Sequence, residues 1–219
     1  LLMALKSGIN PKKIVFSGVG KTTDEISYAI DKNILLINAE SKSEVKEINR
    51  IAKFKRKKVQ IGIRLNPNTD AKTLSKISTG KKENKFGVNN QTFIEILNYC
   101  KNSKNINLKC LSVHIGSQIL DYRPYKKMLE VISKILDKIN YKFEFIDLGG
   151  GMGISYDDDN KKLNYRNRGC YFISSHWNGS FNSFNSGSQQ IKNYILFSFY
   201  NASFVSRSYN RYIYCCFVG

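Results

Sequence analysis

Two short runs of the sequence carry residues that could hold an anionic ligand. Gly149-Gly150-Gly151 directly follows the strand-like run 143–148, and glycines there let backbone N–H groups approach an anion without a Cβ in the way. The run 112–118 places His114 between apolar neighbours, with the hydroxyl of Ser117 three residues later. Taken alone, the glycine run could also form a tight turn, and the histidine could also be a buried core residue. Together they predict a phosphate-bearing ligand whose flat part lies beside an imidazole.

A third run, Gly18-Val-Gly-Lys-Thr22, looks like part of a nucleoside-triphosphate phosphate loop. That motif needs a glycine five positions before its Gly-Lys pair, and Val15 occupies the position here. The loop is therefore too short to wrap a triphosphate. Thr22 and Glu25 instead match a capping box at the start of a helix. The run predicts a turn that begins a helix.

These runs lie in a chain that alternates strand-like and helix-like segments. Predicted strands cover residues 14–16, 34–37, 59–65, 111–115 and 143–148, and predicted helices cover 23–31, 43–55, 92–101 and 122–139. This order favours a parallel sheet with helices outside it, either a doubly wound sheet or a barrel. Polar or glycine-rich motifs follow every predicted strand, which is the layout of a barrel mouth. We therefore expect an α/β fold, a partial (β/α)₈ barrel with about five βα units.

The composition is strongly basic, with a formal net charge of +18. Lysines are spread through nearly every segment, and the densest run, residues 53–58, lies at the end of a predicted helix, where cations favour the helix dipole. We expect a solvated basic face and no nucleic-acid partner. No apolar run approaches the ~18 residues of a membrane span, and no secretion leader is recognisable, so we expect no membrane partner and a cytoplasmic location. The 5 cysteines form no C-x-x-C pair and predict no metal site.

Several motifs occur together in one order: FSGVGKTTDEI, IRLNPNTD, ISTGKKENKFGV, LSVHIGSQILD and IDLGGGMGISY. In this combination the chain resembles the fold-type III pyridoxal-phosphate decarboxylases, and among them the diaminopimelate decarboxylases. The resemblance implies an alanine-racemase-like barrel, the cofactor pyridoxal 5′-phosphate, and decarboxylation of meso-diaminopimelate to L-lysine. HIGSQILD favours this branch over the related ornithine and arginine decarboxylases. The alternative from another functional class is a small barrel protein that binds pyridoxal phosphate without catalysing a reaction.

The resemblance also implies roles for particular residues. His114 would stack on the pyridine ring of the cofactor, and Arg64 would lie near its phenolic oxygen. The phosphate would be bound by Ser117 and by backbone groups of Gly149, Gly150 and Gly151. The implied partners are a small-molecule amino-acid substrate and, for the intact enzyme, a second identical subunit.

Two expected catalytic motifs are absent from the sequence. The family joins its cofactor to a lysine in a Tyr-Ala-x-Lys-Ala-Asn type motif, and a later Glu-Pro-Gly-Arg motif supplies the glutamate for the pyridinium nitrogen. Neither motif occurs in the 219 residues. We therefore expect no catalytic residue in this chain and an inactive fragment of a decarboxylase.

Residues 167–219 differ in composition from those before them. All 17 Asp and Glu lie within residues 1–166, and the later residues are rich in Ser, Asn and aromatic side chains. Either a low-complexity tail or translation in a shifted reading frame would explain this composition. The abrupt change in composition favours the shifted frame. We therefore divide the chain into a partial pyridoxal-phosphate-binding barrel, 1–166, and an anomalous tail, 167–219, without predictable fold. Five strands of a barrel would leave two unpaired sheet edges.

Overall fold

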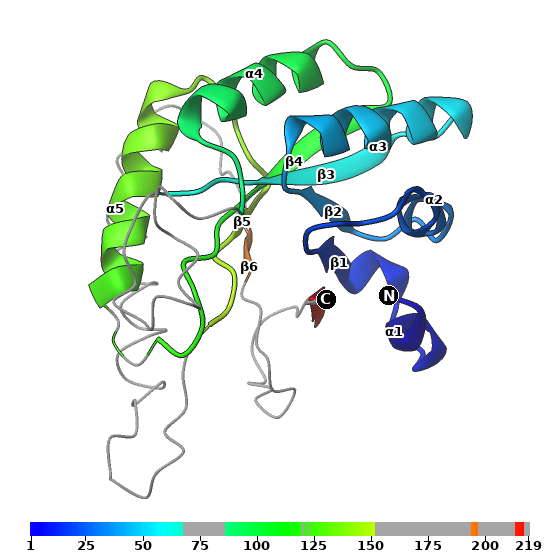
Figure 1. Cartoon of the computed structure of the whole chain (residues 1–219), viewed down its shortest axis with the longest axis horizontal. Coiled ribbons are helices and arrows are strands. Elements are labelled where there is room, and N and C mark those ends of the chain that lie inside the picture. The colour runs from blue at the N-terminus through cyan, green and yellow to red at the C-terminus, as the bar shows by residue number, and fades with distance from the viewer. Residues whose placement is uncertain (68–85, 120, 122, 152–193, 197–212, 217–219) are drawn as a thin grey trace, which may run out of the picture.

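The computed structural model describes residues 1–67, 86–119, 121, 123–151, 194–196 and 213–216. Within them, one parallel sheet has the strand order β6-β5-β4-β3-β2-β1-β7. The strands are β1 Ile14–Ser17, β2 Leu36–Ala39, β3 Val59–Arg64, β4 Ile106–Ser112, β5 Phe145–Asp147, β6 Tyr194–Leu196 and β7 Ile213–Cys216. The helices are α1 Leu2–Lys6, α2 Thr23–Asp31, α3 Lys42–Phe54, α4 Asn90–Lys101 and α5 Arg123–Lys138, with a 3₁₀ turn, η1, at Pro11–Lys13. Helices α2 to α5 lie around the outside of the curved sheet (Figure 1).

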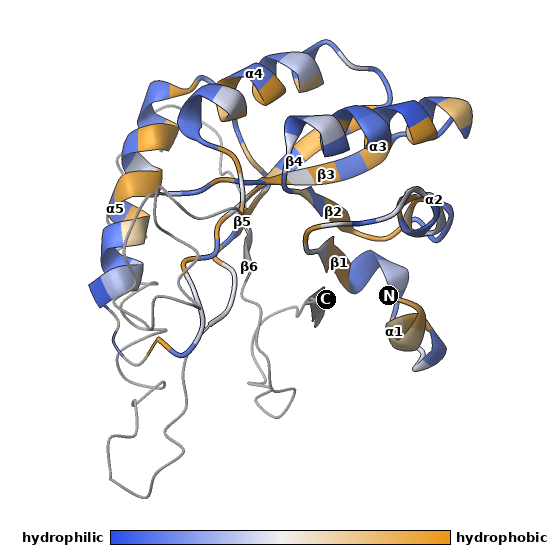
Figure 2. Cartoon of the chain, in the orientation of Figure 1, coloured by the Kyte–Doolittle hydropathy of each residue, from blue (hydrophilic) through white to orange (hydrophobic). Residues whose placement is uncertain are grey.

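Helices α2, α3 and α4 begin at capping residues that the sequence supplies. The predicted capping box of α2 is confirmed, because Thr22 Oγ1 accepts from the Glu25 N–H and the Glu25 side chain accepts from the Thr22 N–H. Ser41 and Asn89 cap α3 and α4 in the same position. Helices α2 to α5 each bury a set of mainly apolar residues, and Figure 2 shows apolar residues (orange) interspersed with hydrophilic ones (blue) along them. Among the described helices, none has the length and apolar character of a membrane span.

Three predicted strands have wrong bounds, of which β5 is merely shorter than the predicted 143–148. Strand β4 begins at Ile106 and ends at Ser112, so His114 lies in the loop after the strand and not within it. The prediction began where the sequence becomes uniformly apolar, but the first half of β4 alternates buried and half-buried residues. Strand β2 is likewise shifted, ending at Ala39.

The edges of the five predicted strands are not left open as expected, because each is paired with one further strand, and β6 and β7 are the outer strands of the sheet among the described residues. Strand β7 pairs with β1, with Phe16 opposite Cys215, and β6 pairs with β5, with Ile146 opposite Ile195. The physical reason is that an edge strand presents free backbone donors and acceptors to any extended segment. Most of residues 167–219 lies outside the described part of the chain, so the interpretation of that segment stays a prediction.

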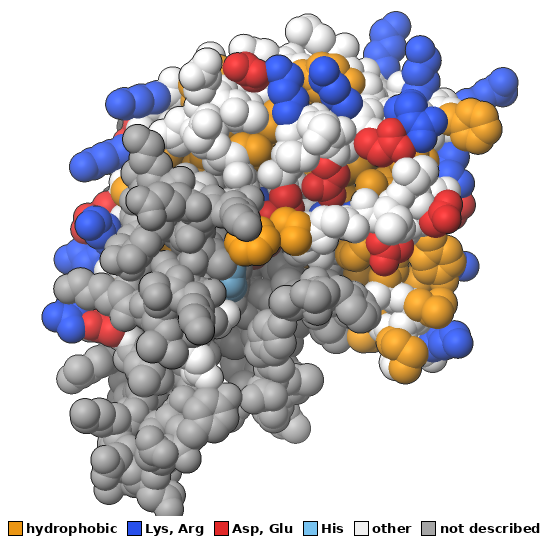
Figure 3. Space-filling view, viewed as in Figure 1, with side chains coloured by type: hydrophobic (Ala, Val, Ile, Leu, Met, Phe, Trp, Pro, Cys, Tyr) orange, Lys and Arg blue, Asp and Glu red, His pale blue; other side chains and the backbone are white. Residues whose placement is uncertain are grey.

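The basic residues are distributed and largely solvated. Figure 3 shows Lys and Arg side chains around the rim of the visible face, with acidic side chains among them. From the densest run, Lys55 and Lys57 both pair with Asp31, with N–O distances of 2.6 and 3.2 Å.

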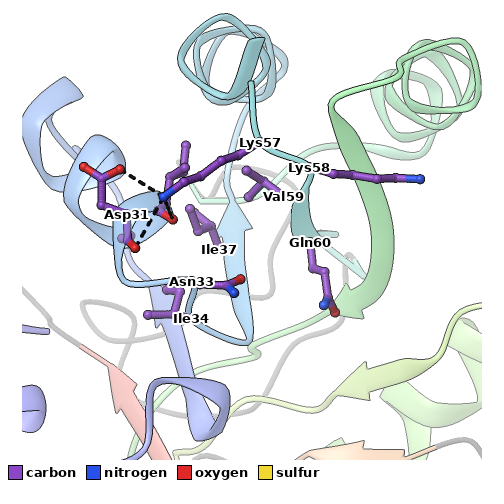
Figure 4. A pocket seen from close by; sticks show the side chains of 10 residues that line it. Asp31, Asn33, Ile34, Ile37, Lys57, Lys58, Val59 and Gln60 are labelled. Atoms are coloured by element: carbon purple, nitrogen blue, oxygen red, sulfur yellow. Dashed lines mark hydrogen bonds and ion pairs between the residues drawn. The ribbon is translucent and has the colours of Figure 1, made fainter. Parts of the chain in front are cut away.

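A cavity of about 310 Å³ opens near the amino ends of β2 and β3. Figure 4 shows the side chains of Asp31, Asn33, Lys57 and Gln60 around it. The ammonium of Lys57 is directed to the Asp31 carboxylate and to the last carbonyls of α2. Active sites of barrel proteins form at the carboxyl edge of the sheet, and this cavity lies at the opposite, amino edge. Residues at that edge are expected to contribute to stability.

Candidate functional site

Two loops meet at the carboxyl edge of β4 and β5. We name residues 113–119 the histidine loop and residues 148–151 the glycine loop. The N–H of Val113 donates to the Asp147 carbonyl at 2.7 Å, and the N–H of Ile119 donates to the Gly151 carbonyl at 2.8 Å. These bonds fasten both ends of the histidine loop to the chain that carries the glycines.

The glycine loop fits against the histidine loop only without side chains. Gly149 has φ 69°, and an added Cβ would lie 2.6 Å from the Val113 carbonyl oxygen and 2.7 Å from His114 Nδ1. Gly151 has φ 91°, and an added Cβ would lie 1.7 Å from the Gly116 oxygen. Both positions therefore require glycine, for backbone conformation and for space.

A pair of donors lies where the loops meet. Ser117 is exposed and lies next to Gly151. Their closeness follows from the distance of 3.3 Å between Ser117 Cα and the position that a Cβ would take on Gly151. Within the described residues, neither the Ser117 hydroxyl nor the Gly151 N–H makes a hydrogen bond. By contrast, the N–H of Gly149 donates to Asp147 Oδ1 at 2.9 Å, and that of Gly150 to His114 Nδ1 at 3.4 Å. The available donors of the predicted phosphate site are thus the Ser117 hydroxyl and the Gly151 N–H.

The imidazole of His114 is neutral near pH 7. Burial, and then the nearby positive charge of Arg64, lower the pKa of His114 from 6.5 to about 4. Since Nδ1 accepts from the Gly150 N–H, the single proton belongs on Nε2. A neutral, partly buried ring is suited to lie against another flat ring.

Arg64, at the end of β3, is held by an acidic partner. Its Nη1 donates to both carboxylate oxygens of Glu40, at 2.9 and 3.1 Å, and its guanidinium lies 5.4 Å from the Phe86 ring centre. Arg64 is the register partner of Ser112 on β4, the residue that directly precedes the histidine loop. The residues predicted for the site are therefore gathered on neighbouring strand ends.

A known protein family matches most of the chain. Residues 1–189 match the family described as "Pyridoxal-dependent decarboxylase, pyridoxal binding domain". The chain belongs to this family. The match runs past residue 166, where the composition changes.

Among its pyridoxal-dependent relatives are enzymes named diaminopimelate decarboxylase. The chain is 46% identical over 159 residues to that of Helicobacter pylori strain J99, and 39% identical over 165 residues to that of Aquifex aeolicus. These matches cover 71% and 74% of this chain, but 39% of each relative. The chain thus spans about two fifths of the length of these curated relatives.

A solved structure confirms the fold prediction. The diaminopimelate decarboxylase from Helicobacter pylori, complexed with L-lysine, aligns with a TM-score of 0.75 and 38% identity over 89% of this chain and 48% of that one. The parallel half-barrel is therefore part of the barrel of pyridoxal-dependent decarboxylases, as the sequence predicted.

The site fits a pyridoxal phosphate group. The Ser117 hydroxyl and the Gly151 N–H are donors suited to phosphate oxygens, and the neutral ring of His114 lies in the neighbouring part of the same loop. Among the described residues, no His, Cys, Asp and Glu cluster could hold a metal ion.

Lys21, the lysine of the phosphate-loop-like run, has a structural role. Its ammonium donates to the carbonyls of Gly18 and Asn38, at 2.5 and 2.7 Å, and to Glu44 Oε1 at 2.7 Å. The Lys21 side chain is only 2% exposed. All three ammonium hydrogens are thus committed to protein oxygens, which leaves none for a nucleotide phosphate.

Sequence reasoning assigned no role to several residues that support the site. The Tyr125 hydroxyl, on α5, donates to the Gly150 carbonyl at 2.9 Å. Asp147, Ser112 and Asn38 form a buried hydrogen-bonded group beneath the glycine loop. The positions of Asp147 and Asn38 at strand ends were a usable signal, whereas nothing in the sequence marks which face of α5 carries Tyr125.

Proposed function

We propose that this chain contributes the cofactor site of an enzyme that decarboxylates meso-diaminopimelate to L-lysine. The observation that carries the proposal is the fastening of the histidine loop to the glycine loop, which brings His114, Ser117 and Gly151 together. The names of the most similar relatives, at 39–46% identity, support the substrate.

Each residue has a task in this proposal. Ser117 and Gly151 would hold the phosphate of the cofactor, and His114 would support its ring from one side without adding a charge. Arg64, oriented by Glu40, would supply a positive charge at the mouth of the barrel, near the phenolic oxygen. The bound cofactor would supply the electron-withdrawing ring that makes loss of carbon dioxide possible.

We further propose the domain division and the setting of the enzyme. Residues 1–166 would be the barrel part, and 167–219 an anomalous tail whose lack of acidic residues supports a shifted reading frame. The coding DNA, read in the other frames beyond residue 166, should then encode Glu-Pro-Gly-Arg, and its absence from every frame would contradict the idea. The intact enzyme would be a cytoplasmic homodimer acting on a small amino acid.

A chimera tests the reaction. The homologous segment of the Helicobacter pylori decarboxylase would be replaced by residues 1–160 of this chain. We expect the chimera to release carbon dioxide from meso-diaminopimelate and form L-lysine. A folded chimera that binds the cofactor but prefers L-ornithine or L-arginine would instead support the related decarboxylases. Binding without any decarboxylation would support a non-catalytic barrel.

A further inference from the structure

A buried polar group lies inside the curved sheet, below the proposed cofactor site. Its members are Asn38 at the end of β2, Ser112 at the end of β4 and Asp147 at the end of β5, with exposed fractions of 1%, 5% and 3%. Asp147 Oδ2 accepts from Asn38 Nδ2 at 2.8 Å and from the Ser112 hydroxyl at 2.9 Å. Asn38 Nδ2 also donates to the Ser17 hydroxyl at 2.9 Å. The ends of four strands are joined through one carboxylate and one amide.

The bond between Asn38 and Asp147 crosses the inside of the sheet. Strands β2 and β5 are separated by β3 and β4, so these side chains are not sheet neighbours. Gly62 is the β3 residue opposite Asn38, and a Cβ added there would lie 2.0 Å from Asn38 Oδ1. The missing side chain of Gly62 therefore leaves room for the amide to reach across β3.

The orientation of the Asn38 amide is fixed by its neighbours. Its Oδ1 is buried, receives no hydrogen bond from any residue that the structure describes, and faces Gly62. Turning the amide over would place that oxygen against the Asp147 carboxylate and lose the donated hydrogen bond. A buried acceptor without a donor is costly, so the bond to Asp147 must outweigh that cost.

The other oxygen of Asp147 reaches the glycine loop. Asp147 Oδ1 accepts from the N–H of Gly149, the residue whose left-handed backbone lets the loop pack on His114. Asp147 thus connects a rigid network of strand ends to the backbone that forms the phosphate site.

We propose that Asp147 is a positioning residue, which holds the glycine loop in its cofactor-binding conformation through the Gly149 N–H and is itself aligned by Asn38 and Ser112. This inference rests on the proposed function and deepens it. Asp147 does not touch the cofactor in this scheme. It acts through Gly149, which sets the place of the Gly151 N–H and of the His114 ring.

The test uses the full 219-residue chain with Asp147→Asn. An amide of equal size offers one acceptor oxygen, so it cannot accept from both Gly149 on one side and Asn38 on the other. We expect the amide signal of Gly149 to shift in an NMR spectrum without ligand. Pyridoxal phosphate, titrated by calorimetry, should bind at least tenfold more weakly. The matched control is Asp137→Asn, an exposed acid on α5, which should change neither measurement.

The outcomes separate the two proposals. If the unaltered chain does not bind pyridoxal phosphate, the proposed function fails, while the Gly149 signal still tests the hydrogen bond. If Asp147→Asn lowers the melting temperature but leaves both the affinity and the Gly149 signal unchanged, Asp147 is merely structural and the inference is overturned. Should that variant not fold, Asn38→Ala removes one donor and keeps the carboxylate. We expect it to weaken binding several-fold, and unchanged affinity would overturn the inference.

Discussion

Replacing Gly151 with alanine should disrupt the contact between the histidine loop and the glycine loop. The φ of 91° is unfavourable for a residue with a Cβ, by about 1–2 kcal/mol. The added Cβ would lie 1.7 Å from the oxygen and 2.8 Å from the carbon of Gly116, and these backbone atoms cannot rotate away. Separating the loops would cost about 1–3 kcal/mol in repacking and about 0.5–1.5 kcal/mol for the hydrogen bond from Ile119 to Gly151. We expect the free energy of unfolding to fall by roughly 3–6 kcal/mol.

The measurement is urea denaturation followed by far-ultraviolet circular dichroism. Gly8→Ala is the matched control, because Gly8 has φ 77° but nothing within 4 Å of an added Cβ. That variant should lose only the backbone contribution, about 1–2 kcal/mol. The difference between the variants isolates the contact of the loops. Equal losses of stability in Gly151→Ala and Gly8→Ala would refute the close packing of the two loops.

Two further predictions concern charged groups. Because the pKa of His114 is depressed in the folded chain, this residue contributes stability that is fully present above about pH 6.5 and is lost as the pH falls towards 4, by up to roughly 3 kcal/mol. An NMR titration should give His114 a midpoint near 4 that rises in Arg64→Gln, and a midpoint near 6.5 in the unaltered chain would contradict this. Lys21→Met should lower the free energy of unfolding by about 3–5 kcal/mol, since it leaves the nearly buried Glu44 without its cation. Lys42→Met is the control: Lys42 pairs with Glu95, both side chains are exposed (41% and 45%), and the free energy of unfolding should fall by under about 1 kcal/mol. If chemical denaturation showed similar losses of stability in the two variants, the structural role of Lys21 would be contradicted.

Local signals in the sequence predicted most of the fold. The bounds of α2 and its capping box depend on neighbouring residues, and both agree with the structure. The end of β4 was missed because apolar residues continue into the histidine loop, where they pack against the core instead of extending the sheet. The pairing of β6 and β7 with the sheet was missed because residues 167–219 show no alternation of apolar and polar residues from which strands could be predicted.

The proximity of the proposed site residues could be predicted in part, again from local signals. His114, Ser117 and the three glycines lie in short motifs, so their proximity follows from two adjacent strand ends. The link from Asn38 to Asp147 joins positions 109 residues apart and depends on the curvature of the sheet and on the space above Gly62. No local pattern encodes that combination.

The binding of pyridoxal phosphate to the 219-residue chain, followed by the ³¹P NMR signal of the phosphate, tests the central claim most directly. We predict a saturable change in chemical shift, and a dissociation constant raised roughly tenfold by His114→Ala and by Ser117→Ala. Pyridoxal without phosphate, followed by calorimetry, should bind more weakly than the phosphorylated form. A phosphate signal that does not saturate, or equal affinities in the unaltered chain and both variants, would contradict a cofactor site at the junction of the two loops.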